Sequence, residues 1–182
     1  MLGSSEIKMK KFLIALLASI FTVSANAQSN PTQKFKEWTV GVISENAGMY
    51  AITFNDSNVL FGNYCYFKIQ KCVWILGINL KTEEDARYPV LMNSKHGALN
   101  TAMTCDSAKN IGVQSRCVFE TPESISESIN AGGQIGFAFP LADGKFHVSR
   151  FSLSGANDAV NFMRDLVSRA GAGKENTRDS RL

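Results

Sequence analysis

Short runs in which apolar and polar residues alternate, separated by turn-forming residues, fill most of the chain after residue 35. Trp38, Val40 and Val42 alternate with small or polar neighbours, and the same period of two recurs in later runs. This period places successive side chains on opposite faces of a strand. Roughly eight to ten such runs predict a mainly β domain of the antiparallel β-sandwich or barrel-like class.

Two local signals add detail to this β pattern. The Asp143-Gly144 dipeptide lies between two alternating runs and is typical of a tight hairpin. Pro89 has no backbone N–H to donate, so residues 88–92 are predicted to form a strand at the edge of a sheet.

Two segments break the pattern and predict helices. Thr121 and Pro122 are residue types that begin a helix, and Gly132 is a type that ends one, so we expect a short helix between them. A C-terminal amphipathic helix is expected from its cap at Ser154 to Gly171, and we expect its apolar stripe to pack on the sheet. The stripe consists of Ala159, Val160, Met163, Leu166, Val167 and Ala170.

The first 27 residues have the pattern of an export signal. Lysines at positions 8, 10 and 11 precede an apolar run over 12–23, and Ala25-Asn26-Ala27 has the spacing of a cleavage site. The apolar run is too short to cross a bilayer as a helix, which needs about 20 residues. We therefore expect cleavage after Ala27 and a periplasmic or secreted protein without membrane insertion. The natural start is either Met1 or Met9.

Removal of residues 1–27 would leave one β-rich domain over 28–170 and a polar tail over 171–182 that is predicted to be disordered. The removed segment carries three Lys and one Glu, so the formal net charge falls from +3 to +1. So small a charge gives no field that would recruit nucleic acid.

All four cysteines, Cys65, Cys72, Cys105 and Cys117, lie in the mature part. An even number in an exported domain predicts two disulfides, for which the sequence alone permits three pairings. The apolar phase flips between Ile69 and Cys72, as at a turn or bulge, which would turn Cys65 and Cys72 to the same face. We therefore favour the local pairs 65–72 and 105–117. Neither spacing matches a zinc site or a Cys-x-x-Cys redox pair.

The sequence contains no motif for catalysis, for a cofactor or for a metal. His96 lies in an expected loop, and His147 is expected to be exposed, because it is out of phase with its apolar neighbours. An enzyme is therefore the poorer hypothesis. Tyr64 and Tyr66 lie on the strand face opposite Cys65, so we expect them to be solvent-exposed and to form a possible binding surface.

The back half of the chain has a recognisable order of features. A strand ending in Cys105 is followed by Cys117, a short helix, Gly132-Gly133, a hairpin and the segment Ser152-Leu153-Ser154-Gly155-Ala156, which runs into the last helix. With Trp38 in an early strand, this order resembles the invasion-associated locus B family of exported bacterial proteins. The resemblance implies a small disulfide-stabilised β-sandwich that is associated with the envelope, with virulence and with host-cell invasion or stress. It implies no catalytic residues.

Three classes of function are compatible with these features. We favour a non-catalytic exported binding module that acts through contact with an unknown protein partner. The alternative is a periplasmic inhibitor or immunity protein that neutralises a toxin or hydrolase, and an enzyme with a dispersed site is the third class. An adjacent toxin gene would favour the immunity hypothesis.

Overall fold

The computed structural model describes residues 32–44, 47–108, 112–141 and 143–175. The predicted signal peptide, residues 1–27, and residues 176–182 of the predicted tail lie outside the described residues. The elements are β1 (Gln33–Phe35), β2 (Trp38–Ser44), β3 (Gly48–Phe54), β4 (Leu60–Tyr66), β5 (Lys71–Ile78), β6 (Ala86–Ser94), β7 (Gly97–Ser107), β8 (Ser115–Phe119), α1 (Pro122–Ala131), β9 (Gln134–Pro140), β10 (Phe146–Ser152) and α2 (Ala156–Glu175).

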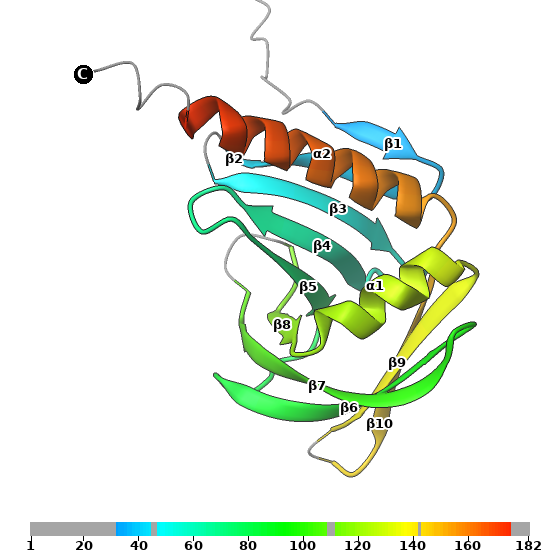
Figure 1. The fold of residues 1–182 in the computed structure, drawn as a ribbon. Coiled ribbons are helices and arrows are strands. Elements are labelled where there is room, and N and C mark those ends of the chain that lie inside the picture. The colour runs from blue at the N-terminus through cyan, green and yellow to red at the C-terminus, as the bar shows by residue number, and fades with distance from the viewer. Residues whose placement is uncertain (1–31, 45–46, 109–111, 142, 176–182) are drawn as a thin grey trace, which may run out of the picture.

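The strands form one antiparallel sheet in the order β1-β2-β3-β4-β5-β8-β7-β6-β9-β10. The sheet curls, so that β2, β3 and β4 lie on one side of α1 and β6, β7 and β9 lie on the other (Figure 1). The end strands β1 and β10 are not paired with each other, and the sheet is therefore open. The mainly β, antiparallel class is confirmed, in the form of a single curled sheet with two helices.

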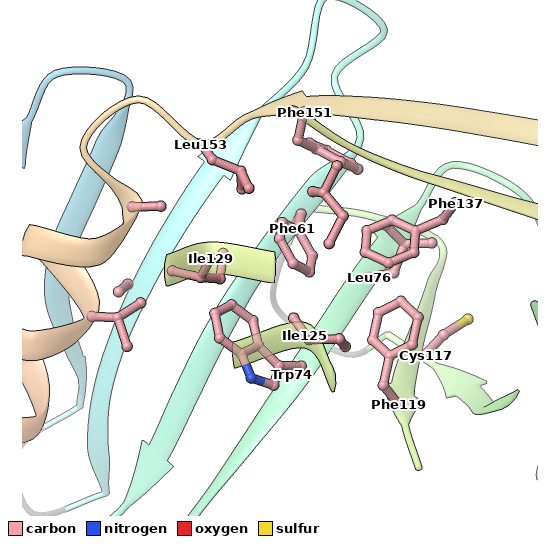
Figure 2. Close-up of a cluster of buried hydrophobic side chains, with 14 of the residues drawn as sticks. Phe61, Trp74, Leu76, Cys117, Phe119, Ile125, Ile129, Phe137, Phe151 and Leu153 are labelled. Atoms are coloured by element: carbon pink, nitrogen blue, oxygen red, sulfur yellow. The ribbon is translucent and has the colours of Figure 1, made fainter. Parts of the chain in front are cut away.

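One aromatic core joins the two halves of the curled sheet. Phe61 from β4 lies at its centre, with its ring 5.3 Å from that of Trp74, 5.0 Å from Phe137 and 5.2 Å from Phe151. Ile125 of α1 is fully buried beside these rings (Figure 2). Because this apolar area is buried from both sides of the curl, the core holds the halves together without any closing strand pair.

Both favoured disulfides are present, and each joins two adjacent antiparallel strands. Cys65 lies directly opposite Cys72 in the β4–β5 hairpin, and Cys105 lies opposite Cys117 in the β7–β8 pair. The β4–β5 turn includes Gln70 with a positive φ of 49°, so the expected change of phase before Cys72 is a hairpin turn.

The helices begin close to their predicted starts. Pro122 is the first residue of α1 and follows Thr121, although the Thr121 side chain makes no capping hydrogen bond. Gly132, with φ of 67°, ends the helix as expected. The long helix α2 covers β1, β2 and β3 (Figure 1). Five of the six residues of its predicted apolar stripe pack on the core as expected, and Ala170 is exposed. The helix continues to Glu175, so the expected end at Gly171 was wrong.

The Ser152–Ala156 segment meets the start of the described chain. The Trp38 indole Nε1 donates a hydrogen bond to the Ser152 carbonyl at 3.1 Å. Gly155 has φ of 87°, and a Cβ there would lie 2.1 Å from the Phe35 carbonyl oxygen. A side chain at position 155 is therefore excluded by both conformation and space. The two segments that carried the family resemblance contact each other.

The prediction of an edge strand at Pro89 was wrong. β6 lies inside the sheet between β7 and β9. Its pairing with β9 covers only Leu91 to Ser94, whereas Pro89 is opposite Ala102 of β7. β6 therefore accommodates Pro89, which has no backbone N–H to donate, because the pairing of β6 with β9 begins only at Leu91.

Candidate functional site

The outer face of β6, β9 and β10 carries a groove of about 660 Å³. On β9, the side chains of Ile135 and Phe137 point into the core, and Gly136 and Ala138 face outward. Because β9 lies between β6 and β10, these two small residues form the floor, and the larger side chains of the neighbouring strands form the walls. The groove is a direct consequence of this alternation between small and large residues.

The strand register pairs each wall residue with a floor residue. Leu91 of β6 and Val148 of β10 are both opposite Ala138. One step along, Asn93 and Arg150 are both opposite Gly136. The groove therefore has an apolar section at Ala138 and a polar section at Gly136.

The apolar section continues to the end of the β9–β10 hairpin. Leu91 and Val148 are each 50% exposed, and Phe146, opposite Pro140, is 66% exposed. These are three of the five exposed large hydrophobic side chains in the described part of the chain. Contiguous apolar surface of this kind is typical of an interaction site.

The polar section is positively charged. Lys95 and Arg150 line the groove, and no aspartate or glutamate does. Neither cation forms a salt bridge with any residue that the structure describes. The Nε2 atom of His96, which follows Lys95 in the chain, lies 3.3 Å from Oε2 of Glu127 in α1. The groove therefore offers two unpaired positive charges to an anionic group.

Local hydrogen bonds fix the turns around the groove. The hydroxyls of Ser94 and Ser128 lie 3.0 Å apart and join the β6–β7 turn to α1. In the β9–β10 hairpin, the Lys145 backbone N–H donates to Asp143 Oδ1 at 3.1 Å, and Gly144 has φ of 78°. The hairpin predicted from Asp143-Gly144 is confirmed.

Tyr64 and Tyr66 lie on the outer face of the opposite half of the sheet. The expectation that both are exposed was wrong for Tyr64, which is only 7% exposed. It is buried in one cluster with Leu60, Ile75 and Val113, and Val113 lies just before β8 in the chain. Burial raises the pKa of the Tyr64 hydroxyl well above its usual value of 10. Tyr66 is half-buried at the border of this cluster.

The other residues singled out from the sequence have structural environments. Cys65, Cys105 and Cys117 are fully buried in their disulfides. His147 is half-buried and not exposed as expected; its Nε2 lies 2.9 Å from the Ser149 hydroxyl, and burial lowers its pKa. Over residues 32–44, 47–108, 112–141 and 143–175, no group of three or more potential metal ligands occurs.

Sequence reasoning did not identify the groove. The alternation of Gly136 and Ala138 with large apolar residues was visible, and so was the hairpin that brings Val148 and Arg150 beside them. The contribution of the third strand, β6, was not visible, because no sequence pattern indicates that residues 91–94 pair with residues 135–138.

Comparison with known proteins reveals a shared fold. No protein-family model matches the chain, and no curated protein sequence matches it. Among solved structures, the chain is similar to the crystal structure of invasion-associated protein B from Bartonella henselae. The TM-score is 0.56 at 15% sequence identity, over 75% of this chain and 97% of that protein. The predicted resemblance to this group therefore holds for the fold. Neither helix of the described chain is long and apolar enough to span a membrane.

Proposed function

We propose that this chain is an exported, non-catalytic binding protein that contacts a protein partner through the outer face of β6, β9 and β10. The observation that carries the proposal is the groove itself, with its small-residue floor, its exposed Leu91 and Val148 and its two unpaired cations. Side chains of a partner would fill the apolar section, and an acidic side chain would pair with Arg150 or Lys95.

Export is supported by two independent features. The first 27 residues have the charge, apolar length and small-residue pattern of a cleaved signal. The two disulfides are of the kind that persists in oxidising compartments. Periplasmic or secreted placement, with cleavage after Ala27, therefore belongs to the proposal.

Site-specific photo-cross-linking tests the proposed face. A photoreactive amino acid would replace Leu91 in the groove wall, and in a matched control it would replace Ile69, which is 63% exposed in the β4–β5 turn. The exported protein would then be irradiated in its native host. We expect a discrete protein adduct from position 91 and none from position 69.

A second variant makes the result specific to the groove. Ala138→Trp would fill the floor from outside without entering the core, because Ala138 faces outward. We expect this change to abolish the adduct at position 91 while the disulfides and the circular dichroism spectrum stay unchanged. An adduct that survives Ala138→Trp, or equal adducts from positions 91 and 69, would refute the proposed face. Capture of a toxin or a hydrolase would favour the inhibitor alternative at the same surface.

A further inference from the structure

The two edges of the open sheet differ in how they are protected. β1, at one edge, has only three residues, includes the exposed Lys34, and places the Phe35 ring 5.2 Å from Phe162 of α2. β10, at the other edge, has seven residues and an unbroken register with β9. It contains no proline and no bulge, its one charged residue is Arg150, and its exposed face carries Phe146, Val148 and Arg150. Long edge strands without a bulge or a cover are templates for pairing with another strand.

Part of the β10 edge is already used. The Ser152 carbonyl accepts the indole hydrogen bond of Trp38, and the Ser154 carbonyl accepts a hydrogen bond from Glu37 N–H at 3.3 Å. Towards the hairpin, β9 is the only strand among the described residues that pairs with β10. The available edge therefore runs from Phe146 to Arg150, and its middle residue is Val148.

The side chains along this edge are self-complementary. Phe146, Val148 and Arg150 alternate on the exposed face of β10. In an antiparallel pair with a second copy centred on Val148, the two Val148 side chains are opposite each other. Each Phe146 is then opposite the Arg150 of the other copy, where a guanidinium over an aromatic face is attractive. A register centred on Arg150 would oppose two like charges and is disfavoured.

We infer that this chain forms a symmetric dimer through antiparallel pairing of residues 146–150 of β10 with the same residues of a second copy. This goes beyond the proposed function, because it assigns a second copy of this chain to the β10 edge. Val148 and Arg150 line the groove and also belong to the paired edge, whereas Leu91 and Lys95 belong to the groove alone. The pairing joins the two sheets and places the two grooves on one continuous face. Five residue pairs bury little area, so the dimer is a weak, reversible one.

Sedimentation equilibrium over a wide concentration range tests the dimer on the purified exported protein. We expect reversible association of the parent chain. Val148→Lys places two ammonium groups opposite each other and should weaken association roughly tenfold or more. Leu91→Lys adds the same charge to the same face, two strands from the edge, and should leave association unchanged.

Position 146 tests the register. Phe146→Glu would pair a carboxylate with Arg150 of the second copy and should retain the dimer, whereas Phe146→Lys should abolish it. Circular dichroism and intact disulfides would confirm that each variant is folded. A parent chain that stays monomeric at all concentrations would overturn the inference and leave the edge to a strand of another protein. Association that persists in Val148→Lys, or that responds equally to both changes at position 146, would also overturn it. Adduct formation at position 91 is a separate readout, so either proposal can fail alone.

Discussion

The two halves of the sheet present outer faces of opposite character. On β3, β4 and β5, the outer side chains pack against each other and against Val113, and Tyr64, Leu60 and Ile75 are buried there. On β6, β9 and β10, the outer face has a floor of glycine and alanine, and its large apolar residues remain exposed. One outer face is thus a second, small core, and the other is an open groove. The expected exposure of Tyr64 was wrong because Tyr64 lies on the self-packed face.

The largest effect that would test this contrast is a pair of matched truncations. Ile75→Ala should cost about 2–5 kcal/mol of unfolding free energy, because Ile75 is 1% exposed in the outer cluster. Leu91→Ala should change the unfolding free energy by no more than about 0.5 kcal/mol, because the side chain is 50% exposed. Urea denaturation measures both values. Equal losses would show that the two outer faces do not differ in the way described.

The disulfides sharpen the comparison because each half contains one. Removal of Cys105–Cys117 by paired Ala substitution should cost about 3 kcal/mol, and removal of Cys65–Cys72 about 2.5 kcal/mol, from loop closure in the unfolded chain. The measurement is the urea concentration at which half of each double variant is unfolded. The comparison requires that the slope of the unfolding free energy against urea concentration stays the same as in the parent chain. A much larger loss of unfolding free energy on removal of Cys65–Cys72 would mean that this disulfide also maintains the native packing of the self-packed half, in addition to restricting the unfolded chain.

The smallest effect concerns pH. The pKa of Tyr64 is higher in the folded protein than its usual value of 10, so the folded state holds this proton more tightly than the unfolded state. The contribution of this protonated hydroxyl to the unfolding free energy is complete below pH 10 and is lost as the pH rises above 10. The unfolding free energy should therefore fall by about 1 kcal/mol between pH 10 and 11. Tyr64→Phe should remove this part of the alkaline loss, and an unchanged pH profile in that variant would contradict the burial of the hydroxyl.

Much of the fold follows from local signals. Strand alternation gave the mainly β class, Asp143-Gly144 gave the last hairpin, and the phase of apolar residues around Cys65 and Cys72 gave their pairing. Each of these depends on residues that are near in sequence, where turn chemistry and side-chain period act directly.

The buried outer cluster and the groove depend on contacts between distant residues and were harder to predict. Tyr64 is buried in one cluster with Val113, which lies about fifty positions later in the sequence. No residue pattern within the strand of Tyr64 indicates this contact. The groove needs the register between Leu91 and Ala138, and Pro89 argued against an interior position for the strand that provides it.

The hydrogen bond between Trp38 and Ser152 has a kinetic consequence. It joins residues 114 positions apart, and contacts of such separation form slowly, because a long loop must close first. Synthesis delivers a chain from its N-terminus, so Trp38 emerges long before the carbonyl that it binds. This hydrogen bond between an early strand and the end of β10 can therefore form only after almost the whole domain has been synthesised.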